Sequence, residues 1–200
     1  METRFARLLS YILHPLLLPT LSFPVIYSLP TVFSQGLPFK ALLWLFVTVF
    51  LFTFIIPVIG TLLLLYNRKI RSLEMYEAGD RTMPLMITGI SYMALYYLTR
   101  GASIPAIYLY FIYGSIIILE TGMMINLFWK ISLHTGGLSG IAAIGMLVWP
   151  QTLLFMIPFV ACVAWSRVVL REHTRAQVIA GCIFGFTTTI IITSLVMNRI

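Results

Sequence analysis

Hydrophobic residues form seven long runs along the chain, and most of the charged residues lie between these runs. The runs cover residues 8–33, 39–66, 83–98, 104–128, 136–149, 153–170 and 178–197. Continuous apolar runs are typical of transmembrane helices, because a bilayer core contains no water to satisfy backbone polar groups. The pattern therefore predicts an all-α fold, a polytopic helical membrane protein with six to seven transmembrane helices in one bundle.

The first run leaves the number of crossings open. It contains Pro15, Pro19, Pro24 and Pro30, and proline interrupts the hydrogen bonding of a helix interior. This segment is therefore expected to be bent or re-entrant.

The composition agrees with a bilayer environment. Hydrophobic residues make up 60% of the chain and charged residues 10%, with a mean hydropathy of +0.99, whereas a soluble domain is about half apolar and a quarter charged. No change in composition divides the chain, so residues 1–200 are expected to form a single domain. The net charge of +7 is spread over short loops, which favours the lipid bilayer over nucleic acid as a partner. The oligomeric state stays open.

Small residues predict where helices approach each other closely. Gly136 and Gly140 are four residues apart, as are Gly181 and Gly185. Such pairs let two helix backbones pack together in a membrane, so these two segments are expected to contact other helices through their glycines.

Polar residues gather at three stations, defined here as residues 67–81, 130–134 and 167–177. Two predicted crossings separate each station from the next, so all three should lie on one face of the membrane. They bring together Arg81 from the first station, Lys130 and His134 from the second, and Arg167, His173 and Gln177 from the third.

Arginine and histidine on one face suit phosphate chemistry. Arginine binds phosphate through two parallel hydrogen bonds and stays charged, while one histidine can attack phosphorus and another can protonate the departing oxygen. The alternative is that these residues are ordinary interfacial residues, with Lys and Arg reaching the headgroup level and His near helix ends.

The third station carries a resemblance to a known family. Ser166-Arg167, five residues, His173, three residues and Gln177 resembles the third signature of the type 2 phosphatidic acid phosphatase superfamily, which is Ser-Arg, five residues, His, three residues, Asp. The resemblance covers a core of about residues 67–197. Gln177 stands where that signature has an aspartate.

The other two stations are similar to the remaining signatures of this family over fewer residues. Ser132 and His134 match the serine and histidine of the second signature, Pro-Ser-Gly-His. Arg81 and Pro84 resemble the Arg-Pro of the first signature with two residues inserted, and Glu74 takes the place of its lysine.

The resemblance implies a membrane-embedded lipid phosphatase that needs no cofactor and no metal. His173 would be the nucleophile and form a phosphohistidine, and His134 would be the general acid. Arg167 and Arg81 would bind the phosphate oxygens, with Lys130 beside them, and the amide oxygen of Gln177 could orient His173. The substrate would be a phosphorylated or pyrophosphorylated membrane lipid.

A different class of function remains open. Glu120 lies deep in the run 104–128, and an acid within a membrane span is a candidate proton relay, although it can also be a paired structural residue. Together with Gln177, it is compatible with a lipid transporter or lipid-binding protein that does not hydrolyse its ligand.

The distribution of positive charge predicts the orientation. With seven crossings, ten of the 13 Lys and Arg residues lie on the side of the three stations, and only Lys40, Arg100 and Arg199 lie opposite. The positive-inside rule then places the site at the cytoplasmic face of a bacterial inner membrane. Many relatives in the superfamily act at the outer face, and the bias disappears if the first run fails to cross.

Overall fold

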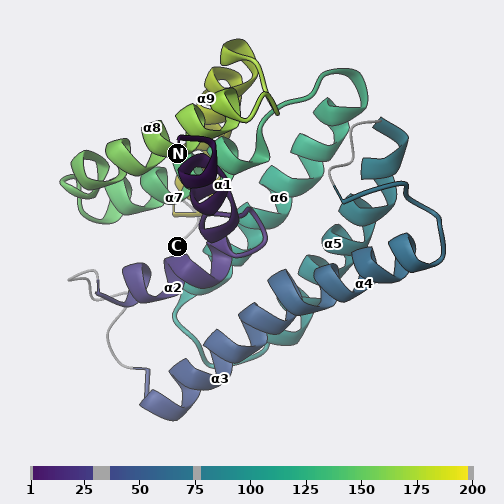
Figure 1. Ribbon diagram of the computed structural model, residues 1–200. Coiled ribbons are helices and arrows are strands. Elements are labelled where there is room, and N and C mark those ends of the chain that lie inside the picture. The colour runs from purple at the N-terminus through teal and green to yellow at the C-terminus, as the bar shows by residue number, and fades with distance from the viewer. Residues whose placement is uncertain (1, 29–36, 74–77, 198–200) are drawn as a thin grey trace.

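The computed structural model describes residues 2–28, 37–73 and 78–197, and within these ranges the regular structure is helical, with no strand (Figure 1). The helices are α1 (Glu2–Ile12), α2 (Leu18–Ser28), α3 (Phe39–Phe50), α4 (Ile56–Tyr66), α5 (Ala78–Thr99), α6 (Ala106–Phe128), α7 (Leu133–Val148), α8 (Thr152–Val169) and α9 (Arg175–Met197). A π-helical turn, η1 (Leu51–Ile55), joins α3 to α4. The predicted all-α fold is confirmed for the described residues.

Four helices in the described part of the chain are long and apolar enough to cross a membrane. They are Phe39–Tyr66, Ala106–Phe128, Thr152–Val169 and Arg175–Leu195, and the apolar helix Leu133–Leu147 is shorter. These helices are compatible with an integral membrane protein. The prediction of six to seven spans is therefore confirmed in part, because the described residues contain four candidate spans.

The helices pack in two groups that meet at α6 (Figure 1). Helix α5 lies between α4 and α6, while α7 packs against both α8 and α9, and α6 contacts α7 and α9. Helix α1 packs on α8, and α2 contacts α3 and α7. The buried core between these elements is formed by large side chains such as Phe23, Leu45, Leu95 and Tyr108.

Glycines allow α7 and α9 to approach closely, as the two pairs predicted. A Cβ atom at Gly185 would collide with the backbone carbonyl oxygen of Gly136, and one at Gly181 would collide with Thr135 and with the backbone of Ser132. Hydrogen bonds cross the same contact, because Thr135 Oγ1 donates to the Val178 carbonyl (3.0 Å). This contact fixes the start of α7 against the start of α9.

Replacing Gly185 by alanine should therefore force α7 and α9 apart and destabilise the protein by about 1–3 kcal/mol, the usual cost of overpacking. Gly114 provides the matched control, because a Cβ atom there would have no neighbour within 4 Å. Thermal unfolding in detergent should show a lower midpoint for Gly185→Ala and little change for Gly114→Ala. Equal midpoints would contradict the close packing.

The bend expected in the first apolar run is present. Helix α1 ends at Ile12 and α2 begins at Leu18, while Pro30 lies outside the described residues. Helix α1 docks on α8 through buried Ala6 and through Phe5, whose ring centroid lies 6.1 Å from that of Trp165. The turn between α1 and α2 thereby reaches the end of the molecule where α8 ends.

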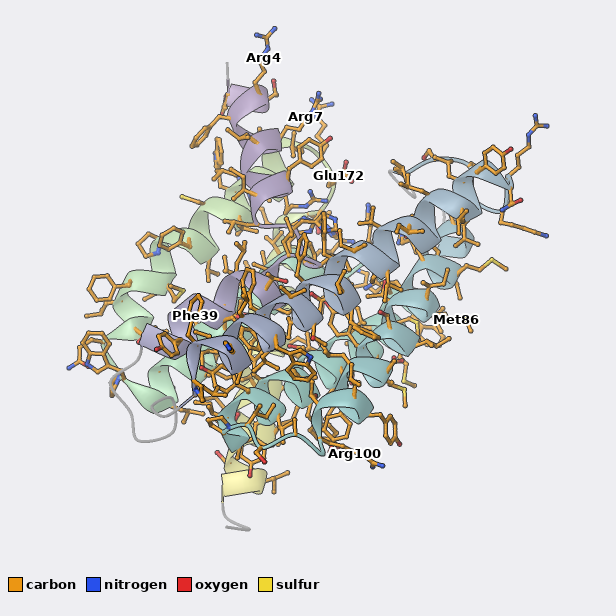
Figure 2. All side chains as sticks on the ribbon, turned by 90° about the horizontal axis from the view of Figure 1, so that it is seen from below. Arg4, Arg7, Phe39, Met86, Arg100 and Glu172 are labelled. Carbon is orange, nitrogen blue, oxygen red and sulfur yellow. The ribbon has the colours of Figure 1, made fainter. Side chains whose placement is uncertain are left out.

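Figure 2 shows where four of the charged residues lie. Glu172, Arg4 and Arg7 lie at one end, and Arg100 lies at the opposite end.

Candidate functional site

The second and third stations meet in a cluster of basic side chains. The carboxylate of Glu172 lies between two cations, with its Oε2 atom 3.7 Å from Lys130 Nζ and 3.8 Å from Arg167 Nη2. The ring of His173 contacts the same loop, because its Nδ1 atom lies 3.3 Å from the Lys130 carbonyl oxygen. Side chains separated by about 40 residues in the sequence therefore face one another.

The end of α8 explains how Glu172 and His173 reach Arg167. Arg171 adopts a left-handed backbone conformation with φ of 57°. The Arg171 N–H donates to the Val168 carbonyl (3.0 Å), and the Glu172 N–H donates to the Arg167 carbonyl (3.1 Å). These two bonds form a Schellman motif, which reverses the chain at a helix end. A third bond, from the His173 N–H to the same Arg167 carbonyl (3.2 Å), holds the histidine at the turn.

The hydrogen bond of His173 determines which ring nitrogen is free. A backbone carbonyl can only accept, so Nδ1 carries the hydrogen and donates it to the Lys130 oxygen. In the neutral ring, Nε2 then has an unshared electron pair. Burial, together with the positive charges of Arg167 and Lys130, lowers the pKa of His173 from 6.5 to about 4. At neutral pH the residue is therefore an uncharged imidazole with a nucleophilic Nε2 atom.

Gln177 lies in the first turn of α9 and forms a capping box with Thr174. Its Oε1 atom accepts a hydrogen bond from the Thr174 N–H (3.0 Å), and its own N–H donates to Thr174 Oγ1 (3.3 Å). The pattern Thr, two residues, Gln is the sequence signature of such a box. Gln177 also acts on His173, because its side chain raises the pKa of that ring against the effect of burial. The hydrogen bond that fixes the His173 tautomer goes to the Lys130 carbonyl. Gln177 caps the start of α9, a role that the comparison with the family's aspartate did not predict.

Replacing Gln177 by leucine should lower the free energy of unfolding by about 1 kcal/mol, the usual value of a helix cap. Gln177→Glu should keep that stability, since glutamate forms the same box. If the Gln177 side chain also acts on His173, the leucine variant should lower the pKa of His173 further. Thermal unfolding and nuclear magnetic resonance titration of His173 on the same preparations separate the two roles, and unchanged values for Gln177→Leu in both would exclude them.

Ser10, in α1, connects two of the predicted site residues. Arg167 Nη1 donates to Ser10 Oγ (2.7 Å), and His134 Nε2 lies 3.3 Å from the Ser10 carbonyl oxygen. Since that carbonyl accepts, His134 carries a hydrogen on Nε2. Ser10 itself is 4% exposed. The site therefore includes the first helix, which the sequence placed outside the phosphatase-like core.

His14 is a third histidine of the site. Its ring lies edge to face against His134, with centroids 5.3 Å apart. The Leu16 N–H donates to His14 Nδ1 (3.3 Å), so the hydrogen of the neutral ring is on Nε2. The only signal of His14 in the sequence was a histidine before a proline in the first apolar run.

Arg81 contributes charge to the cluster from the beginning of α5. Burial lowers the pKa of Lys130, the charges of Arg81 and Arg167 lower it further, and Glu172 opposes them. Arg81 therefore lies close enough to Lys130 for their charges to interact. The first station joins the other two at this end of the bundle.

Glu120 lies outside this cluster. It is in α6, where its carboxylate packs against Gly89 of α5, and a Cβ atom at position 89 would collide with it. Within the described residues it makes no hydrogen bond or ion pair with the basic side chains of the site.

An apolar cavity of about 60 Å³ lies next to the site. Leu16, in the turn that follows His14, and Leu133, next to His134, line the cavity near the site. Ile118 and Ile144 line its deeper part. Its walls come from α2, α5, α6, α7 and α9. The cluster of polar side chains and the apolar cavity thus share the α1–α2 turn and the start of α7.

In the part of the chain that the structure describes, no three His, Cys, Asp or Glu side chains gather in a way that could hold a metal ion. Comparison with known proteins adds no further guide, since no family model, no curated protein and no solved structure matches the chain.

Proposed function

We propose that the protein is a membrane-embedded phosphatase that hydrolyses a lipid phosphate through a phosphohistidine intermediate. The observation that carries the proposal is the state of His173, a neutral imidazole whose Nδ1–H is held by the Lys130 carbonyl, so that the electron pair of the ring is on Nε2. Arg167 and Lys130 surround it with positive charge. This combination of a fixed nucleophile and phosphate-binding cations is what phosphoryl transfer requires.

Spare hydrogen-bonding capacity on Arg167 supports an anionic ligand. Among the described residues, the buried Nε atom of Arg167 has no hydrogen-bond partner, which normally costs about 1–3 kcal/mol. A phosphate oxygen would satisfy this donor and could replace the Ser10 hydroxyl at Nη1. Arginine then stabilises the charge on the transferring phosphoryl group.

In the proposed reaction, the Nε2 electron pair of His173 attacks phosphorus, a nitrogen–phosphorus bond forms and the bond from phosphorus to the lipid oxygen breaks. Binding of the phosphate anion favours the protonated form of His134, which then gives its proton to the departing lipid oxygen, so the lipid leaves as an alcohol. Neutral His134 then takes a proton from a water molecule that attacks the phosphohistidine. Cleavage of the nitrogen–phosphorus bond releases inorganic phosphate and restores both histidines.

The bilayer supplies the substrate in this proposal. The apolar cavity beside the cluster would take the first carbons of a lipid chain, while the headgroup meets Arg167 and His173. Helices α5 and α7 would also cross the membrane and complete the predicted bundle. The excess of Lys and Arg on the side of the site favours a site facing the cytoplasm of a bacterial inner membrane.

Titration of His173 provides a direct prediction. Its folded-state pKa of about 4 lies below the unfolded value of 6.5, so the unfolded state binds the proton first, and stability should fall as the pH drops from about 6.5 to 4. Nuclear magnetic resonance of histidine-labelled protein, assigned with His173→Asn, should give a midpoint near pH 4. Added phosphate should raise that midpoint, because an anion favours the charged ring. A midpoint at or above pH 6 would contradict the proposed resting state.

Phosphate release by the purified protein in detergent tests the proposal. The panel contains phosphatidic acid, phosphatidylglycerol phosphate and a polyprenyl diphosphate, with glycerol 3-phosphate as the soluble control. We expect release from at least one lipid and little from the soluble ester. Absence of release from every lipid would overturn hydrolysis.

Glu120 supports a second candidate, a lipid transporter that keeps the anion site without hydrolysing its ligand. An acid in the middle of α6, packed against a glycine of α5, is costly in a membrane and is typical of proton-coupled movement. Lipid flux in liposomes without phosphate release, and dependent on Glu120, would favour this function over hydrolysis.

A further inference from the structure

Glu172 places a negative charge inside a site whose other charged groups are positive. A single oxygen, Oε2, lies 3.7 Å from Lys130 Nζ and 3.8 Å from Arg167 Nη2. Both distances are those of ion pairs longer than an ordinary hydrogen bond. The carboxylate therefore reduces the positive charge of the site, and an oxygen ligand would share the two cations with it.

The backbone keeps Glu172 in this position. Its N–H donates to the Arg167 carbonyl as part of the motif that ends α8, and its side chain is 22% exposed. A bound phosphate would thus share the site with the carboxylate, and the ligand's charge would be felt directly by Glu172.

We propose that Glu172 restricts the site to a single phosphoryl group, so that the preferred substrate is a lipid phosphate monoester and not a lipid diphosphate. This inference rests on the proposed function. The first phosphoryl group is attracted by Lys130 and Arg167 at close range, with the charge of Arg81 adding to theirs. A second phosphoryl group would bring further negative charge next to the carboxylate, and like charges in a partly buried site repel strongly.

The test compares binding of inorganic phosphate and pyrophosphate to the full-length protein in detergent by titration calorimetry. Glu172→Gln removes the charge and keeps the shape, while Glu172→Asp keeps the charge. We expect the glutamine variant to raise pyrophosphate affinity about tenfold more than phosphate affinity. The aspartate variant should keep the wild-type ratio. The same ratio of affinities in wild type and Glu172→Gln would overturn the inference.

Arg167→Ala separates this inference from the proposed function. If that variant loses phosphate binding while Glu172→Gln leaves the ratio unchanged, the anion site stands and only the role of Glu172 is wrong. If wild type and every variant bind neither anion, or if Arg167→Ala binds phosphate like wild type, the anion site itself is wrong and both proposals fail. In the reaction, Glu172→Gln should shift the ratio of kcat/KM values toward a lipid diphosphate.

Discussion

Replacement of His173 by alanine should reduce phosphate release from the lipid substrate by about 10⁴-fold or more, the usual effect of removing a catalytic nucleophile. The Lys130 carbonyl holds the Nδ1–H of His173, which directs the electron pair of Nε2 beside the charges of Arg167 and Lys130. The measurement is kcat/KM for phosphate release in detergent, with folding checked by thermal unfolding.

A matched comparison uses the three histidines of the site. His134→Ala should slow the reaction because the leaving oxygen loses its proton donor, and it should still allow phosphate to bind. His14→Asn should have a smaller effect, since in the proposed steps His14 contacts His134 and not phosphorus. Activity of His173→Ala equal to wild type would remove this residue from the reaction.

Replacement of Arg167 by lysine should lower kcat/KM about 100-fold, although the charge is kept. The guanidinium reaches Ser10 with Nη1 and lies beside Glu172 with Nη2, whereas a lysine ammonium is a single point of charge without the planar fork that matches phosphate. Kinetics of phosphate release should show the loss in both kcat and KM, because Arg167 binds the phosphate oxygens in the bound substrate and in the transition state.

Arg175→Lys is the control for this substitution. Arg175 is exposed at the start of α9. It belongs to the third station, as Arg167 does, but it lies outside the cluster. Its replacement should leave kcat/KM within about twofold of wild type. Equal losses in the two variants would mean that the effect is not specific to position 167, and would contradict the role of the Arg167 fork at the phosphate.

Hydropathy predicted most of the helical architecture because long apolar runs have few alternatives in a bilayer. The helix Phe39–Tyr66 and the glycine contacts of α7 with α9 agree with the sequence expectations. The π-helical turn at Leu51–Ile55 has no sequence signal of this kind. There Ser91 donates to the Phe52 carbonyl (2.5 Å), a contact that depends on tertiary packing.

The site was predicted less completely, because the sequence does not say which loops touch. The pairing of crossings brought Lys130 and His173 to one face, but it could not show that Ser10 and His14 complete the same cluster. These two residues precede the phosphatase-like core and carry no motif. The capping box at Thr174 and Gln177 was not predicted either, and the structure shows through it why glutamine suits this position.

The most direct test of the proposed function is to look for the phosphoryl group on His173. Purified protein is mixed with a labelled lipid phosphate, stopped in alkali, which preserves phosphohistidine, and mapped by mass spectrometry of its peptides. The proposed mechanism predicts a phosphoryl group on His173, with more of it in His134→Ala if hydrolysis of the intermediate is slowed. Phosphate release without any labelled His173, or label on His134 instead, would contradict the mechanism.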